Sequence, residues 1–216
     1  RLHLYFDEGH RLGDTAVRHF GAECLINSTL SWLERLPKQI KGQTPVFAKD
    51  TGLSEQLPRI EKEAGKITEL LSMSYPLLKQ YVDQSDHAEG RYRFAHGDVG
   101  KAIRDLASQI TLRTSGWLGR LEVLEDTLSD ALSDKQYPVP LPDIELFYQQ
   151  AGNWLGRAEK LLALWDRLHK ELQQNEMPMA CWLRLDEGGG GNMDISINAS
   201  PIQAAEILRQ QLWGSC

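Results

Sequence analysis

The stretch PDIELFYQQAGNWLGRAEKLLALWDRLHKEL, residues 142–172, gives the clearest indication of the fold, because its apolar residues recur every three or four positions. Such spacing places them on one side of a helix, along the stripe by which antiparallel helices pack. We expect this stripe to contain Ile144, Tyr148, Ala151, Leu155, Ala158, Leu162, Trp165 and Leu172. A helix of ~30 residues would span ~45 Å at 1.5 Å per residue.

Two earlier segments repeat the pattern and predict two more long helices. The first should start at Pro58, a favourable first-turn residue, and bend at Pro76. Its stripe is Ile60, Ala64, Ile67, Leu71, Leu78 and Tyr81. The second should start near Val99, with the stripe Ile103, Leu106, Ile110, Trp117, Leu121, Leu124 and Leu128. A shorter helix is expected after an N-cap at Ser28, with an interruption at Pro37.

Strand patterns occur at both ends of the chain. Residues 2–6 form a short apolar run, and MACWLRL (179–185) and MDISINA (193–199) alternate apolar and polar residues around DEGGGGN, which predicts a hairpin. A final helix is expected from Ser200 and Pro201, and a short strand at 91–95. The sequence therefore predicts a mainly α fold, in which an insert of long antiparallel helices leaves a small α/β part and returns to it.

Composition excludes several classes of protein. The 216 residues carry a net charge of −6, which argues against a surface that is basic throughout. No apolar run approaches the ~18 residues of a membrane span, and no signal peptide is recognisable. Three distant cysteines indicate free thiols in a reducing cytosol, and they are too few for an iron–sulfur cluster, which normally takes four.

The acids after the first apolar run are the clearest chemical signal. Asp7, Glu8 and His10 follow residues 2–6 directly. In nucleotide-hydrolysing motors a first carboxylate in this place holds Mg²⁺ and a second orients the attacking water. A solvated loop is the alternative for an isolated match. Asp186 and Glu187 also follow an apolar run, but they lead into glycines and are interpreted as a hairpin turn.

The segment YFDEGHRLGDTAVRHF, residues 5–20, resembles the DEAH-type motif of the DinG family of ATP-dependent DNA helicases, relatives of XPD. RYRFAHGD (91–98), residues 146–168 and INASPIQAAEILRQQLW (197–213) agree with this family in order. The resemblance implies that residues 1–24 and 177–216 belong to a RecA-like motor domain, of which only a small α/β remnant is present. Residues 25–176 would form a helical arch inserted in that domain.

The same resemblance implies a function and its cofactors. Asp7 would bind Mg²⁺ through water, and Glu8 and His10 would be catalytic. The parent protein would use ATP and Mg²⁺ to move 5′ to 3′ on single-stranded or forked DNA in the bacterial cytoplasm, without a membrane partner. Its iron–sulfur cluster and phosphate-binding loop would lie outside this segment, so we expect the segment alone to be inactive as an ATPase.

DNA contacts are expected at Arg91, Tyr92, Arg93 and Lys101, where cationic and aromatic side chains alternate. A loop with a solvated basic face is the alternative for these residues. The alternative function for the whole chain is a non-catalytic helical module that binds another protein. Strands without their sheet neighbours would also expose edges through which copies of the chain can associate.

Overall fold

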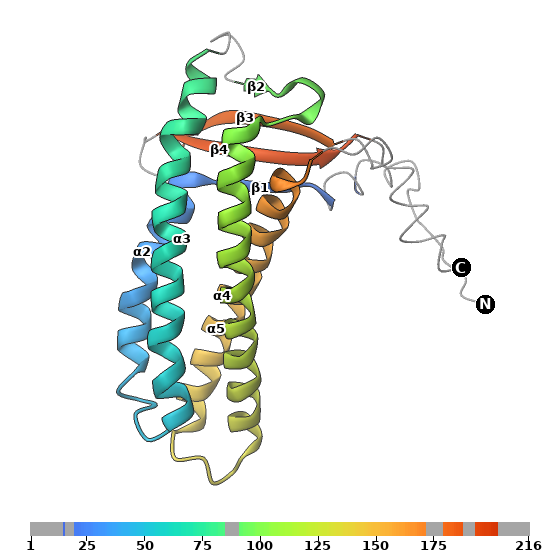
Figure 1. Ribbon diagram of the computed structural model, residues 1–216. Helices are drawn as coiled ribbons and strands as arrows, with labels where there is room; N and C mark the ends of the chain where they lie inside the picture. The colour runs from blue at the N-terminus through green and yellow to red at the C-terminus, as the bar shows by residue number, and fades with distance from the viewer. Residues whose placement is uncertain (1–14, 16–19, 85–90, 172–178, 188–192, 203–216) are drawn as a thin grey trace, which may run out of the picture.

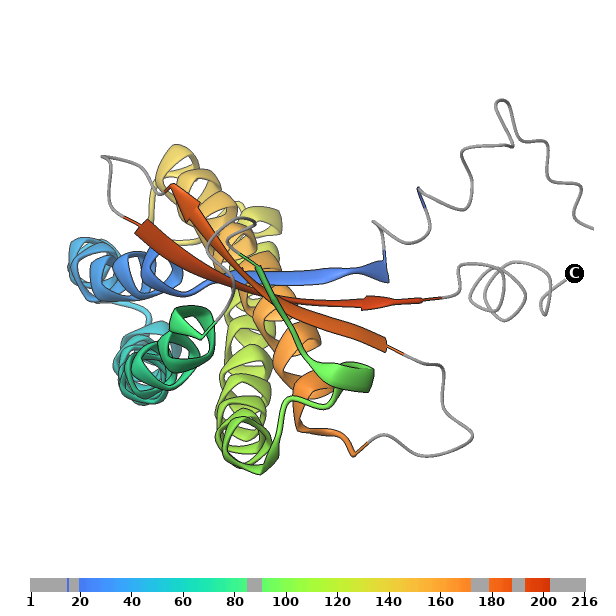
Figure 2. The same cartoon turned by 90° about the horizontal axis from the view of Figure 1, so that it is seen from above.

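Four helices and a four-stranded sheet make up the computed structural model, which describes residues 15, 20–84, 91–171, 179–187 and 193–202 (Figure 1). The helices are α2 (Ile26–Gln43), α3 (Thr51–Asp83), α4 (Lys101–Ser133) and α5 (Leu141–His169). The strands are β1 (Ala22–Leu25), β2 (Arg91–Arg93), β3 (Met179–Glu187) and β4 (Met193–Pro201), and a 3-10 turn, η2, covers Ala95–Gly97. The helices lie side by side as a bundle, and the sheet covers one end of it (Figures 1 and 2). The predicted mainly α fold with a small sheet-containing part is confirmed.

The core of the bundle follows a seven-residue repeat on three helices. The predicted stripe on α4 is buried throughout, as are Trp117 and Trp165. The buried positions of α5 that follow the repeat are Ile144, Phe147, Ala151, Trp154, Ala158, Leu161, Trp165 and Leu168. Tyr148, Leu155 and Leu162 were predicted for this stripe but are only half-buried, and Leu172 lies outside the described residues. The predicted and the observed stripes share Ile144, Ala151, Ala158 and Trp165, which are seven residues apart. Packing against the neighbouring helices buries the residue three positions after each of these, and not the residue four positions after it.

Helix α3 begins earlier than predicted and runs through both of its prolines. It starts at Thr51, and the carboxylate of Asp50 accepts a hydrogen bond of 2.9 Å from the backbone N–H of Leu53. Pro58 is therefore inside the helix, and α3 continues without a break past Pro76 to Asp83. The heptad positions on either side of Pro58 are fully buried, so packing compensates for the hydrogen bond that proline removes.

The prediction for α2 was wrong at both of its marked residues. The helix starts at Ile26, two residues before the expected cap at Ser28, and Pro37 does not interrupt it. Leu33, Leu36 and Ile40 are buried on both sides of Pro37, and this apolar face keeps the helix intact to Gln43.

The four described strands pair antiparallel in the order β1-β4-β3-β2. The predicted hairpin is confirmed as β3 and β4, with Glu187 opposite Met193. Ser200 and Pro201 do not start a helix, because β4 extends to Pro201 by pairing with the beginning of β3. The remainder of the predicted helix, residues 203–213, and the predicted strand at 2–6 lie outside the described residues, as does any motor-domain remnant built from them.

The sheet has one face toward the bundle and one face away from it. Cys24, Ile197, Leu183 and Tyr92 are opposite one another across the four strands and pack into the core. The neighbouring row, Glu23, Asn198, Trp182 and Arg93, points to the other side because side chains alternate along a strand. We call this second side the outer face of the sheet. Residues from both ends and from the middle of the chain therefore share one sheet.

Candidate nucleic-acid interface

The four residues predicted to contact DNA do not lie together. Arg91 and Arg93 are exposed on β2, two residues apart on the outer face. Tyr92 lies between them on the opposite face, where its ring centroid is 5.2 Å from that of Tyr81 and 5.1 Å from that of Phe94. Tyr92 is thus half-buried in the core. Lys101 is exposed at the first residue of α4, beyond the turn that follows β2.

A groove of about 380 Å³ lies next to the two arginines. It is lined by Arg91, Arg93, Phe94, His96, Gly97, Met179, Ala180, Cys181, Trp182 and Ile202. Its described charged residues are the two arginines, and apolar and aromatic side chains supply most of the remaining lining. Both arginines are exposed, and among the described residues neither forms an ion pair.

A tight turn contributes His96 and Gly97 to the lining of the groove. His96 and Gly97 both have positive φ, at 54° and 75°, and a side chain on Gly97 would put its Cβ only 2.2 Å from the carbonyl oxygen of Met179. Only glycine fits this close approach between η2 and the start of β3. The turn therefore fixes His96 at the rim of the groove.

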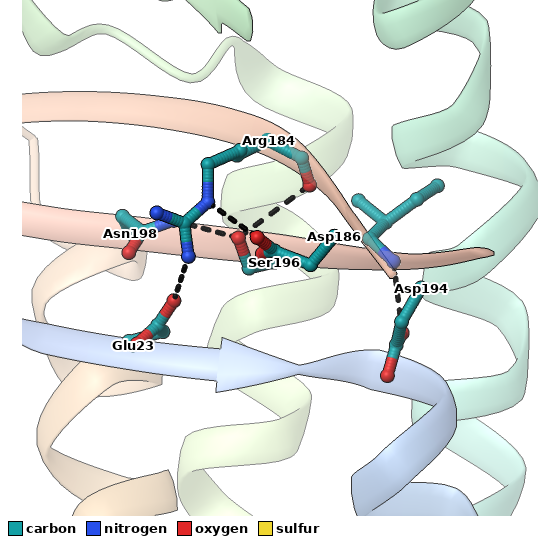
Figure 3. A network of polar contacts seen from close by, with 7 residues as sticks. Glu23, Arg184, Asp186, Asp194, Ser196 and Asn198 are labelled. Carbon is teal, nitrogen blue, oxygen red and sulfur yellow. Dashed lines mark hydrogen bonds and ion pairs between the residues drawn. The ribbon is translucent and has the colours of Figure 1, made fainter. Parts of the chain in front are cut away.

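A polar network occupies the outer face beside the groove (Figure 3). Arg184, opposite Arg91 in the sheet, forms ion pairs with Asp186 at 2.7 Å and with Glu23 at 3.3 Å. Ser196 and Asn198 are buried under this network, and the Asn198 amide donates a hydrogen bond of 3.1 Å to the Ser196 hydroxyl. Unlike Arg91 and Arg93, Arg184 is thus neutralised by described carboxylates.

The carboxylate of Asp194 joins the sheet to α2. Its oxygens accept hydrogen bonds from the backbone N–H groups of Asn27 (2.8 Å) and Ser28 (2.9 Å), and from the Ser28 hydroxyl (2.8 Å). Asp194 is 2% exposed, and the positive end of α2 stabilises its charge. This cap replaces the one that was predicted at Ser28.

A second cavity, of about 250 Å³, lies where β1 meets α2 and α5. The guanidinium of Arg157 is 4.9 Å from the centre of the Trp32 ring, a cation–π contact between α5 and α2. Burial raises the pKa of the nearby Cys24 thiol to about 12 and that of Cys181 to about 11. Both thiols are therefore neutral near pH 7 and poor nucleophiles or metal ligands.

The predicted nucleotide and metal site falls on residues that the structure does not describe. Asp7, Glu8 and His10 are all among residues 1–14. Within the described ranges, no three histidine, cysteine or acidic side chains are grouped so that they would hold a metal ion. No described helix has the length and apolar character to cross a bilayer.

Sequence reasoning missed Trp182 and His96 in the groove. The alternation in MACWLRL was a sufficient signal for Trp182, because it places Trp182 and Arg184 on the face opposite Cys181 and Leu183. The position of His96 depends on the turn of η2 and had no comparable signal in the sequence.

The sequence of the chain was compared with those of known proteins and protein families. No family model matches the chain. Over 214 residues, 96% of its length, it is 25% identical to the ATP-dependent DNA helicase DinG of Photobacterium profundum, and it spans 29% of that relative. The resemblance inferred from residues 5–20 is therefore confirmed, and along almost its whole length this chain is similar to part of a DinG helicase.

Proposed function

We propose that this chain is the arch-containing segment of a DinG-type, ATP-dependent DNA helicase, and that the groove beside β2 contacts single-stranded DNA. The observation that carries the proposal is the pair Arg91 and Arg93, exposed, without a described acidic partner, and beside an apolar groove. Cations that follow a nucleic-acid backbone next to aromatic side chains are the usual means of binding single strands. The similarity to a DNA helicase supports DNA as the ligand of these arginines.

Salt dependence of binding tests the proposal directly. The affinity for an oligothymidylate should fall as salt rises, because each neutralised phosphate releases counterions. Replacing both arginines, Arg91→Ala with Arg93→Ala, should weaken binding at least about tenfold and reduce the slope of log K against log salt by about 1.4. A control pair, Lys49→Ala with Lys135→Ala, removes the same charge from exposed positions at the far end of the bundle. Equal losses in both pairs would contradict the proposal.

The motor part of the proposal rests on Asp7, Glu8 and His10. We propose that Asp7 holds Mg²⁺ through water and that Glu8 and His10 act in ATP hydrolysis in the whole helicase, which moves 5′ to 3′ and carries its iron–sulfur cluster outside this segment. The segment alone contains no Gly-Lys-Ser or Gly-Lys-Thr phosphate loop. We expect it to release no phosphate from ATP above background. Robust ATP turnover by the segment that disappears on Asp7→Asn would overturn the proposal that part of the ATPase site lies outside this segment.

A second candidate function is the binding of another protein by the bundle. A groove of about 350 Å³ between α3 and α4 has Gly116 and Gly119 among its lining, and both glycines face open space. Leu112 and Val123 lie on the same side of α4 and are 71% and 51% exposed. Leu112→Lys with Val123→Lys should leave DNA binding unchanged and abolish capture of a partner helix by this groove.

A further inference from the structure

Trp182 is set apart from the other described tryptophans by its place in the fold. Trp32, Trp117, Trp154 and Trp165 are all buried within the helical bundle. Trp182 is on β3, a central strand of the described sheet, and on the face that points away from the bundle. It is half-buried and lines the groove. Its ring is therefore not needed to fill the core.

The neighbours of Trp182 on β2 are two exposed arginines. Arg93 is directly opposite on β2, where paired residues have Cβ atoms about 5 Å apart. Arg91 is on the same face of β2, two residues from Arg93, which is about 6.6 Å along the strand. This separation is comparable to that of successive phosphates in an extended single strand. A nucleotide whose phosphates contacted the arginines would have the groove and the indole of Trp182 next to its base.

We infer that Trp182 stacks on an unpaired nucleobase and is the residue that makes the groove select single strands, an inference that rests on the proposed DNA contact of Arg91 and Arg93. The arginines recognise only phosphate and cannot tell a paired base from an unpaired one. An indole stacks on the face of a base, which is accessible only when the base is not inside a duplex. His96 at the rim adds a second flat polar ring to the same groove.

The test compares an oligothymidylate with an abasic oligonucleotide of the same length and charge. The intact chain should bind the oligothymidylate about tenfold more tightly, the effect of stacking one base. Trp182→Leu should remove this preference and leave the affinity for the abasic strand unchanged, whereas Trp182→Phe should keep part of it. A preference that survives Trp182→Leu in a folded protein would overturn the inference.

The arginine variants separate this inference from the proposed function. Arg91→Ala with Arg93→Ala should weaken binding of both oligonucleotides. If the arginine substitutions weaken DNA binding but Trp182→Leu does not change the preference for the oligothymidylate, the groove binds DNA and the stacking role is wrong. If none of these substitutions changes binding, both proposals are wrong.

A measurement on the unsubstituted chain covers the case in which Trp182→Leu does not fold. Ultraviolet crosslinking of a bromodeoxyuridine strand should join the DNA to the peptide that contains residues 179–187. Crosslinks confined to other peptides would overturn the stacking role of Trp182.

Discussion

At the scale of single residues, backbone geometry decides the shape of the candidate interface. Gly97 has a φ of 75°, and a Cβ on this residue would lie 2.2 Å from the carbonyl oxygen of Met179. A side chain here meets main chain, which cannot rotate away. One residue that contributes no chemistry of its own thus determines how close η2 comes to β3.

We expect Gly97→Ala to lower the free energy of unfolding by about 2 kcal/mol, because it adds both backbone strain and a clash. Gly116→Ala is the matched control, since a Cβ at Gly116 meets nothing within 4 Å and alanine favours the helix. The control should raise stability by about 0.5–1 kcal/mol. Urea denaturation measures both changes. A Gly97→Ala protein as stable as the unsubstituted chain would contradict the close approach.

The Cys24 thiol makes stability depend on pH. Burial raises its pKa from 9.0 to about 12, so the folded state keeps the proton and the unfolded state loses it first. The contribution is complete below pH 9 and decreases as the pH rises toward 12.

Between pH 7 and pH 10.5, the stability advantage of the unsubstituted chain over Cys24→Val should therefore shrink by about 2 kcal/mol. Comparing the two proteins removes the contributions of other groups that titrate in this range. Denaturation curves at both pH values give the result. An advantage that does not change with pH would show that the thiol already ionises in the folded protein.

At the scale of elements, the beginning of α2 depends on a residue 166 positions away in the sequence. Asp194 on β4 accepts hydrogen bonds from Asn27 and Ser28, whereas the N-cap residue itself, Leu25, contributes none from its side chain. The same carboxylate links the sheet that carries the groove to the bundle. Sheet and bundle should therefore lose stability together when it is removed.

Asp194→Ala should destabilise the protein by about 2–4 kcal/mol, because it leaves two partly buried first-turn N–H groups without their hydrogen-bond acceptor. Asp134→Ala provides the control, since Asp134 accepts one local hydrogen bond from Gln136 at an exposed turn and should cost less than about 1 kcal/mol. Thermal unfolding followed by circular dichroism distinguishes the two. Similar small losses of stability in both variants would show that the Asp194 cap does not stabilise the contact between the sheet and α2.

At the scale of the whole molecule, charge is distributed unevenly along the bundle. Residues 122–145, at the end remote from the sheet, contain seven carboxylates and one lysine. The exposed arginines of the groove lie at the opposite end. An acidic protein can therefore still present a local cationic surface to a nucleic acid.

Neutralising the remote acids should not affect the groove. Helix α4 has 33 residues and is about 50 Å long, whereas charges are screened over about 10 Å at 0.1 M salt. Asp126→Asn with Asp130→Asn should therefore leave the affinity for oligothymidylate within about twofold at 0.1 M salt. A tenfold gain measured by fluorescence anisotropy would indicate that DNA also passes near the far end of the bundle.

The long helices and the hairpin could be predicted from the sequence, because they depend on apolar periodicities of three to four residues and of two residues that are visible in a short segment. The stripe on α4 and the strands β3 and β4 needed no other information. The resemblance to DinG helicases was likewise contained in residues 5–20, and similarity over almost the whole chain confirmed it.

The positions at which helices and strands begin, and the side chains that they expose, depend on tertiary contacts. Packing carried α2 through Pro37 and α3 through Pro58, and pairing with β3 kept Ser200 and Pro201 in a strand. The pairing of β2 with β3 brought Trp182 beside Arg93, and the alternation of side chains along β2 placed Tyr92 on the face opposite Arg91 and Arg93. The physical reason is that local preferences are weak, of the order of 1 kcal/mol per residue, and burial and strand pairing outweigh them.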